Sequence, residues 1–396
     1  MQQRARTPVQ DWTTDWDHLD PQWIEDPYPI WAELRQRCPI AHTERFNGVY
    51  LPTRYADVRA VAYDTDHFSS RRTAIRETHH ESGGGAPPIT SDPPKHRLAR
   101  MVLLPPFTPK AIAALEPKAR RICNQLIDAF NVKGSFDGAV DYAQQIPVRV
   151  IARLLGGPED DGDLFRDWIN AVLNEGITDY ERMMRGLVEM TDYFRPLMEQ
   201  RRKHPGDDLI SYLVKQTYPD GSPFKDNHVL GSVRLMLIAG IDTTWSGIGS
   251  CVWHLATHAD DRRRLVADPS LMPTAIEEFL RAYAPVTMAR EVKQETEING
   301  CRFKQGEMVL LSFPAANRDP EMFPDADKVI IDRKENRHAA FGLGIHRCIG
   351  SNLARMELTV AVEELLKRMP EFGIGGEVTW SEGTVRGPRK LPLKIG

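Results

Sequence analysis

Apolar residues recur with a helical period along most of this chain. Residues 28–37 place three apolar side chains on one helical face, and the pattern stays helical almost throughout residues 109–215. A last amphipathic helix is predicted over residues 350–368. Because apolar residues three or four positions apart lie on one side of a helix, each of these segments can bury one side in a shared core.

Short strands and turns interrupt the helical pattern. An Asn-Gly pair at residues 47–48 predicts a hairpin turn, and after Pro285 the chain changes to short strands with a second Asn-Gly turn at 299–300. A Pro-rich, irregular stretch follows at residues 314–337. No repeat or linker divides the chain, so the sequence predicts a mainly α fold with a small β region, as a single domain over residues 1–396.

The most apolar segment covers residues 229–258 and would span roughly 45 Å as one helix. Arg234 and Asp242 are its only residues charged at neutral pH. A membrane span is the competing interpretation, but Asp242 and two threonines interrupt the apolar run. Four glycines would weaken an isolated helix by up to about 1 kcal/mol each, so packing on all sides must hold it. We therefore expect this segment to be the central helix of the core.

Composition and charge are those of a soluble globular protein. Of the 396 residues, 41% are hydrophobic and 27% are charged, with a formal net charge of −4. This balance gives no reason to expect a nucleic-acid partner. The first residues lack the apolar stretch of a signal peptide, so we expect a cytoplasmic protein. The cysteines are odd in number and far apart, which disfavours a disulfide framework or a zinc site. They are Cys38, Cys123, Cys251, Cys301 and Cys348.

The strongest chemical signal is the segment FGLGIHRCIG at residues 341–350, which places Cys348 just before the predicted last helix. A thiolate there is favoured by the free backbone N–H groups and the dipole of the helix start. The glycines let the backbone approach a flat ligand closely. A structural cysteine in a Gly-rich turn is the alternative. The spacing of the aromatic residue, glycines, basic residue and cysteine resembles the haem-ligand loop of the cytochrome P450 family.

A second segment resembles the same family. Glu278 and Arg281 lie three residues apart and can pair on one helix face. Alone, such a pair is common on protein surfaces and contributes little to stability. In the family the pair is buried and ties its helix to the irregular stretch before the cysteine loop.

The resemblance also implies a set of basic residues around the haem propionates. His96 and Arg100 follow a proline pair and lie four residues apart, so they share one face of a predicted helix. An exposed basic helix is the alternative. In the family the equivalent residues hold the propionates, and the resemblance adds Arg290 and His346 to them. Leu98 departs from the family, which often has Arg there; we expect no effect on haem binding.

The middle of the apolar segment carries polar residues that invite two interpretations. A buried carboxylate such as Asp242 is unfavourable unless it is hydrogen-bonded or hydrated. Thr243 and Thr244 can simply bond back to the carbonyl four residues earlier. The resemblance implies more, because in the family an acid followed by a threonine delivers protons for the cleavage of dioxygen. It assigns these roles to Asp242 and Thr243, with Trp245 packed away from the haem.

The four segments follow the family order over residues 92–350 and imply a haem-thiolate monooxygenase of the soluble bacterial type. Cys348 is the expected axial ligand of the iron of haem b (iron protoporphyrin IX), because a thiolate ligand favours cleavage of the O–O bond. The expected partners are dioxygen and a separate electron donor, either a ferredoxin or a flavin or iron–sulfur reductase. No membrane partner is expected.

The resemblance places a substrate pocket above the haem. The loop of residues 71–90, with its Gly and Pro runs, is long enough to predict a lid or binding loop. Residues 235–244, residues 286–289 and the turn near Thr384 are the other expected walls. Since these side chains are mainly apolar, a small to medium apolar organic substrate is expected.

Three rival functions are disfavoured by the residues. Peroxide-driven peroxygenases and haem-thiolate isomerases commonly lack the acid–alcohol pair that is present here. A haem-binding sensor without turnover needs no proton relay. A hydrolase is disfavoured because Trp245-Ser246-Gly247 lacks the first Gly of a nucleophile elbow.

A basic stretch surrounds Cys348 in the sequence. A solvated surface would explain it, whereas the resemblance places it on the proximal side of the haem, where it would steer an acidic electron donor. Some short sequence segments also resemble the haem domains of family members that are fused to a reductase. We therefore expect either a stand-alone protein or such a haem domain. The basic residues are Arg333, Lys334, Arg337, Arg347 and Arg355, against the single acid Glu335.

Overall fold

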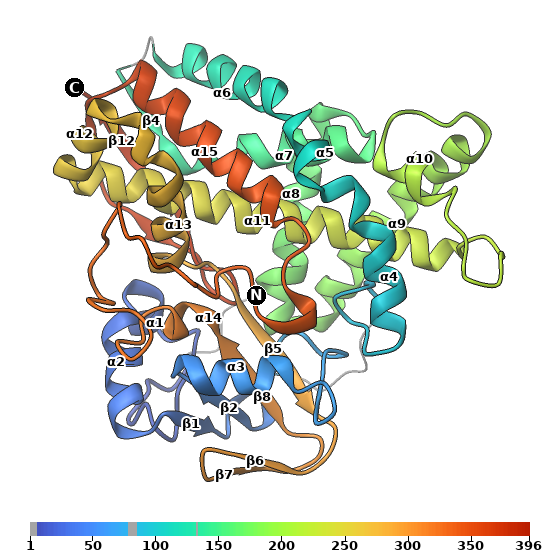
Figure 1. Cartoon of the computed structure of the whole chain (residues 1–396), viewed down its shortest axis with the longest axis vertical. Coiled ribbons are helices and arrows are strands. Elements are labelled where there is room, and N and C mark those ends of the chain that lie inside the picture. The colour runs from blue at the N-terminus through green and yellow to red at the C-terminus, as the bar shows by residue number, and fades with distance from the viewer. Residues whose placement is uncertain (1–5, 78–84, 132–133) are drawn as a thin grey trace.

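The computed structural model describes residues 6–77, 85–131 and 134–396. Helices fill the upper part of the molecule, and a sheet with the amino-terminal helices forms a smaller lower part (Figure 1). The α-helices of the described residues are α1 (Pro21–Glu25), α2 (Tyr28–Arg37), α3 (Tyr55–Tyr63), α4 (Lys95–Leu103), α5 (Pro109–Ala113), α6 (Glu116–Asn131), α7 (Gln145–Leu155), α8 (Gly162–Leu173), α9 (Tyr180–Lys203), α10 (Leu209–Leu213), α11 (Asp226–Thr257), α12 (Ala259–Ala267), α13 (Met272–Ala282), α14 (Phe313–Ala316) and α15 (Ser351–Arg368).

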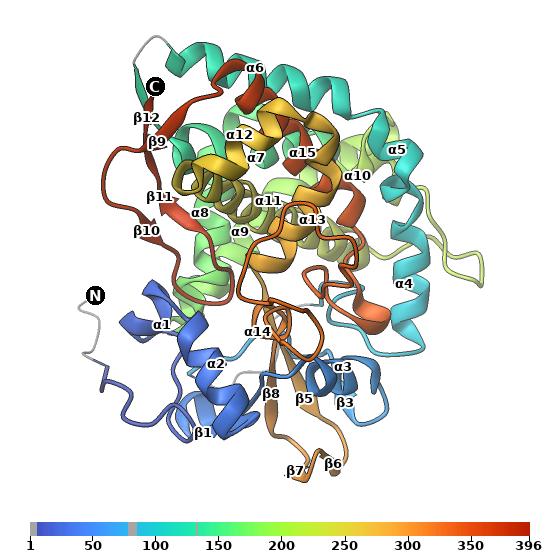
Figure 2. The ribbon, with the colours of Figure 1, turned by 60° about the vertical axis from the view of Figure 1, so that its left-hand side comes forward.

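The strands are short and join parts of the chain that are far apart in sequence. A five-stranded sheet has the order β1-β2-β8-β5-β3, in which β2 and β8 are parallel and the other pairs are antiparallel. Figure 2 shows β5 and β8 running down to the β6–β7 hairpin at the lower tip of the molecule. The strands are β1 (Ile40–Thr43), β2 (Val49–Pro52), β3 (Phe68–Ser69), β4 (Ser135–Asp137), β5 (Thr287–Val292), β6 (Thr296–Ile298), β7 (Cys301–Phe303), β8 (Met308–Ser312), β9 (Phe372–Ile374), β10 (Thr379–Trp380), β11 (Pro388–Lys390) and β12 (Pro392–Ile395).

The predicted central helix is α11, which crosses the middle of the helical part (Figure 1). Among the described residues it is the one helix long and apolar enough to cross a membrane, but 72% of its most apolar window is buried inside the protein. Two of its glycines allow close packing: a Cβ at Gly240 would lie 2.6 Å from Ile151, and one at Gly249 would lie 2.9 Å from Pro388. Packing therefore holds a helix that propensity alone would not.

Other predicted elements are confirmed or corrected. Helices α2 and α15 match their predicted ranges, the latter to within one residue. The first hairpin is confirmed, because β1 and β2 pair antiparallel and a 3₁₀ turn at Arg45–Asn47, followed by Gly48, joins them. Phe46 has a φ of 56° and is buried at this turn. Strand β4 also interrupts the segment expected to be helical almost throughout.

Candidate active site

The cysteine loop is shaped by two glycines that no other residue could replace without strain. Gly342 and Gly344 have φ values of 71° and 68°, a region that favours glycine. A Cβ at Gly344 would lie 2.4 Å from the carbonyl oxygen of Ala62, so the loop approaches α3 very closely. The N–H of Cys348 donates to the carbonyl of Phe341 over 2.7 Å, which closes the loop just before α15.

The Cys348 thiol opens into a cavity of about 410 Å³. It is the exposed cysteine of the chain, whereas Cys123 and Cys251 are buried in the core. Removal from bulk water raises the pKa of Cys348, while the N–H of Gly350 and the guanidinium of Arg100 lower it. A metal ion would deprotonate such a thiol on binding.

Four predicted basic residues gather beside Cys348. The rings of His96 and His346 lie 4.3 Å apart, and the buried Nε2 of His96 has no hydrogen-bond partner among the described residues. Arg100 donates to the carbonyl of Arg347 over 2.6 Å. Arg290, on β5, is 4% exposed and donates to a backbone carbonyl. No described Asp or Glu lines the cavity.

The electrostatics of this cluster call for an anion. Burial, together with Arg290, His96 and Arg100, lowers the pKa of His346 to about 3. Burial lowers the pKa of Arg290 to about 10. His346 is therefore neutral near pH 7, whereas the buried Arg290 keeps its charge, which is unfavourable unless a negative group pairs with it. A flat group with one metal ion and two carboxylates fits this arrangement: Cys348 would hold the metal ion, and the basic residues would pair with the carboxylates.

The Glu278–Arg281 pair is buried, as the resemblance implies, and both side chains are fully inaccessible. Arg281 makes two 2.8 Å hydrogen bonds to Glu278. It also donates to three backbone carbonyls of the irregular stretch, those of Asn317, Ala326 and Lys328. The pair therefore fixes α13 to the segment that leads into the cysteine loop.

The predicted basic surface is smaller than the sequence suggests. Arg333 donates to Glu278 over 3.0 Å, and its side chain is only 8% exposed. Arg355 is paired with Glu277. These two arginines pair with carboxylates on α13, so they contribute less positive charge to the surface. Lys334, Arg337 and Arg347 remain exposed.

Asp242 and Thr243, adjacent on α11, have different neighbours. Thr243 lines the cavity and donates to the carbonyl of Ala239 over 2.7 Å, the backbone bond that is the simpler interpretation. Asp242 is 2% exposed and does not line the cavity. It pairs instead with Arg389 of β11, at 2.9 Å and 3.0 Å. Burial raises the pKa of Asp242, and the charge of Arg389 opposes this shift.

Sequence reasoning missed Arg389. Its guanidinium also donates to Ser246 over 3.0 Å and lies 4.1 Å from the centre of the Trp245 ring. Trp245 packs beside the core, away from the cavity, as expected. No local spacing marks Arg389, because its partner lies 147 residues away; only the need of Asp242 for a positive partner was visible.

The substrate side of the cavity has the predicted walls. Thr384 lines it, as do the expected faces of α11 and β5 and the described parts of the loop at 71–90, while residues 78–84 of that loop lie outside the described residues. Its apolar side chains include Ile89, Val172, Leu173, Ile177, Met183, Leu187, Leu235, Met236, Ile238, Val286 and Met288.

Comparison with known proteins decides the family. The sequence model of cytochrome P450 matches residues 162–369. The chain is 36% identical to mycinamicin IV hydroxylase/epoxidase of Micromonospora griseorubida, over 92% of this chain and 94% of that protein. This chain belongs to the cytochrome P450 family. Like the hydroxylases that it resembles, this P450 is a monooxygenase with a haem-iron cofactor.

Two further relatives agree in sequence and in structure. Vitamin D(3) 25-hydroxylase of Pseudonocardia autotrophica is 35% identical, over 94% of both chains. The crystal structure of CYP109E1 from Bacillus megaterium in complex with testosterone has a TM-score of 0.87 and 32% identity, and it covers 94% of this chain and 98% of that one. The P450 fold, mainly α with small sheets, is thereby confirmed.

Proposed function

We propose that this P450 holds haem b through Cys348 and hydroxylates a small to medium apolar organic substrate. One observation carries the proposal: Cys348 opens into a cavity that Arg100, Arg290 and His346 also line, with His96 packed against His346 and no described Asp or Glu in the lining. Relatives that hydroxylate mycinamicin IV and vitamin D(3) support an apolar substrate. When bound, the haem supplies a thiolate-ligated iron at which dioxygen is activated.

The residues of the chain have distinct tasks in this proposal. Thr243 uses its hydrogen in the bond to Ala239, so its oxygen can accept a hydrogen bond from a group in the cavity. Asp242, held behind it by Arg389, supplies the acidic group of the relay. The apolar walls exclude water from the cavity, which favours transfer of an oxygen atom to the substrate over loss of reduced oxygen as peroxide.

Electrons come, in this proposal, from a separate ferredoxin or a flavin or iron–sulfur reductase that docks near the exposed Lys334, Arg337 and Arg347. These cations would steer an acidic donor toward the side of Cys348. The chain would act as a single haem domain in the cytoplasm.

The carbon monoxide spectrum of the reduced, haem-loaded protein tests thiolate ligation directly. The native protein should give the thiolate-type spectrum. Cys348→Ala should lose it together with nearly all product formation. Cys301→Ala is the matched control, because Cys301 lies on β7 and does not line the cavity, and it should keep the spectrum. A thiolate-type spectrum in Cys348→Ala would refute the proposal.

A further inference from the structure

The described lining of the cavity includes arginines beyond those that the proposed haem would meet. Six arginines line it, while no Asp or Glu among the described residues does. The excess is local, because the whole chain has a formal net charge of −4. The arginines are Arg71, Arg72, Arg76, Arg100, Arg234 and Arg290.

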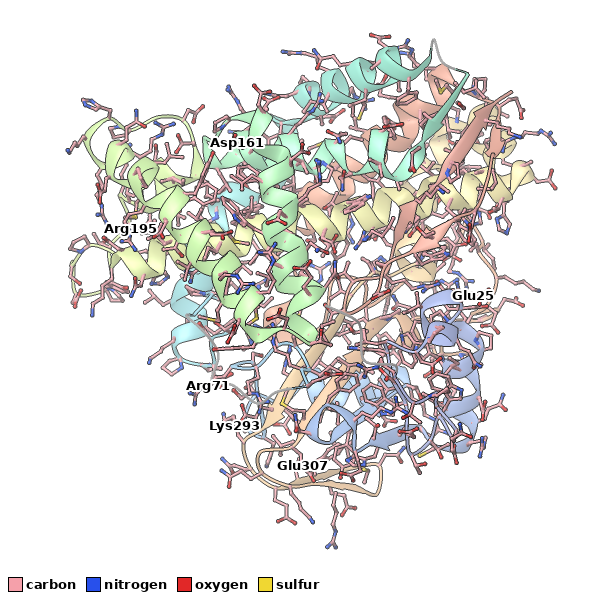
Figure 3. All side chains as sticks on the ribbon, turned by 180° about the vertical axis from the view of Figure 1, so that it is seen from behind. Glu25, Arg71, Asp161, Arg195, Lys293 and Glu307 are labelled. Atoms are coloured by element: carbon pink, nitrogen blue, oxygen red, sulfur yellow. The ribbon has the colours of Figure 1, made fainter. Side chains whose placement is uncertain are left out.

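Two of these arginines belong to the proposed haem site. Arg100 and Arg290 lie by Cys348 and His346, where two propionates would balance their charge. The other four lie on the segment that follows β3 and on α11. Arg71 is exposed, and Figure 3 shows it beside the strands, near Lys293. Arg76 and Arg234 are more enclosed and carry the argument.

Arg76 is held in place against the α8–α9 connection. The carbonyl of Thr73 accepts from the N–H of Ala289, and the N–H of Glu77 donates to the carbonyl of Ile177 over 3.1 Å. Arg76 itself donates to the carbonyl of Gly176. Burial lowers the pKa of Arg76. Its partner at this end is thus a neutral carbonyl, and within the described chain no carboxylate pairs with it.

Arg234 is held in a similar way from α11. It donates to the hydroxyl of Thr191 on α9 over 2.6 Å and more weakly to the carbonyl of Gly85. Burial lowers its pKa. Elsewhere on this side of the molecule arginines do meet carboxylates: Arg202 pairs with Asp226. Arg234 makes no such pair with any residue that the structure describes, although it lines the cavity.

We propose that the substrate is an apolar organic acid whose carboxylate binds Arg234 at the α9 side of the cavity. This inference rests on the proposed function, since it names the substrate class of the same site. A guanidinium offers a carboxylate two parallel hydrogen bonds, which neutral acceptors do not match. The apolar walls, among them Leu235 and Met236, hold the remainder of the molecule.

The positions also set the shape of the substrate. Arg234 precedes Thr243 by nine residues on one helix, which corresponds to roughly 13 Å along its axis. The carboxylate is therefore separated from the carbon that is oxidised by a distance on the order of 10 Å, allowing for the reach of the side chain. Oxidation should fall on the part of the acid remote from its carboxylate.

Spectral titration of the haem-loaded protein with matched pairs of acids and neutral analogues tests the inference. The pairs are decanoic acid with methyl decanoate, and biphenyl-4-carboxylic acid with its methyl ester. At least one acid should bind tenfold or more tightly than its ester, and only the affinity of the acid should fall as salt is added. The inference is overturned if no acid binds, or if every ester binds as tightly as its acid.

Variants locate the binding site within the same assay. Arg234→Gln should weaken acid binding by tenfold or more and leave ester binding unchanged, and Arg234→Lys should retain part of the affinity. Arg76→Gln, which removes a charge elsewhere in the cavity, should weaken acid binding less than Arg234→Gln does. Arg185→Gln is the matched control: it removes one positive charge from the exposed surface of α9, outside the cavity, and should change acid binding less than twofold. Equal losses in all three Gln variants would show a general charge effect and overturn the site.

The carbon monoxide spectrum separates the two levels of the proposal. Each variant is first checked for its thiolate-type spectrum and its melting temperature, neither of which depends on a substrate. A native protein with that spectrum but without preference for acids refutes the acid substrate alone. A native protein without that spectrum refutes the proposed function itself. If an Arg234 variant fails to fold, the acid and ester pairs and the salt dependence of the native protein still decide the outcome.

Discussion

Glu357, on α15, should make the stability of this protein depend on pH in an unusual direction. Its side chain is fully buried, and neither carboxyl oxygen has a hydrogen-bond partner among the described residues. Burial raises the pKa of Glu357 well above its ordinary value of 4.5, so the folded protein holds this group protonated. The unfolded chain ionises it at its ordinary pKa. Its contribution to stability is therefore complete below about pH 4.5 and is lost as the pH rises toward the folded-state pKa.

The size of the effect follows from this difference in protonation. Each pH unit between the unfolded and folded pKa values changes the free energy of unfolding by about 1.4 kcal/mol. As the pH rises above about 5.5, Glu357 should therefore lower the free energy of unfolding at up to that rate until the folded-state pKa is reached. Glu357→Gln keeps the shape but cannot ionise, so the variant should gain stability relative to the native protein at the same rate over the same interval.

Urea denaturation of the haem-loaded native and Glu357→Gln proteins at a series of pH values from about 5.5 upward measures this difference. Glu364→Gln, on the same helix, is the control. Burial raises the pKa of Glu364, but hydrogen bonds from Arg120 and Asn124 outweigh this and lower it overall. Its contribution is already complete above pH 4.5, so its variant should differ from the native protein by a constant amount. A constant difference for Glu357→Gln as well would refute the reasoning, because the carboxyl would then be ionised when folded.

Three further changes have distinct expected outcomes. Arg281→Met should lower the free energy of unfolding in urea by about 3–5 kcal/mol, because it removes two hydrogen bonds from the buried carboxylate of Glu278, which keeps only Arg333 as a cationic partner, and leaves three backbone carbonyls without their donor; a loss below about 1 kcal/mol would contradict this. Thr243→Ala should keep haem and substrate binding but form less product and more peroxide per NAD(P)H consumed; unchanged coupling would move the relay role elsewhere. Reversing Lys334 and Arg337 to Glu should slow stopped-flow reduction by an acidic ferredoxin and weaken its salt dependence, and an unaffected rate would place the donor elsewhere.

Short-range spacing explains how much of the site the sequence could predict. The residues of the loop around Cys348 lie within a few positions of one another, and so do Glu278 and Arg281. Local geometry therefore fixes the relation of the residues within each set. The central helix was predictable because apolar residues cover all of its sides, whereas a surface helix needs them on one side only. The charges near Cys348 were a weaker guide, since Arg333 and Arg355 turn toward carboxylates on α13 that sequence position does not reveal.

Contacts between distant segments account for what the sequence could not predict. Arg76 and Arg234 line one cavity, although 158 positions separate them in the chain. Arginine is usually exposed, so the sequence alone would place each of these residues at the surface. It does not indicate that they are partly buried or that their hydrogen-bond partners are neutral. The charge of a cavity depends on which residues line it and also on which residues do not. Here no described Asp or Glu belongs to the lining.

Asp242 shows where sequence and structure each contribute to the mechanism. The sequence establishes that an acid within an apolar helix needs a partner, but the partner is Arg389, 147 residues away. This pairing compensates the carboxylate charge and directs both oxygens away from the cavity, toward β11. Proton transfer from Asp242 to the cavity therefore requires its ion pair to loosen or its side chain to turn. Thr243 lines the cavity, whereas Asp242 and Arg389 do not, so in the proposed relay Thr243 would be the nearer of the two groups to the reacting atoms.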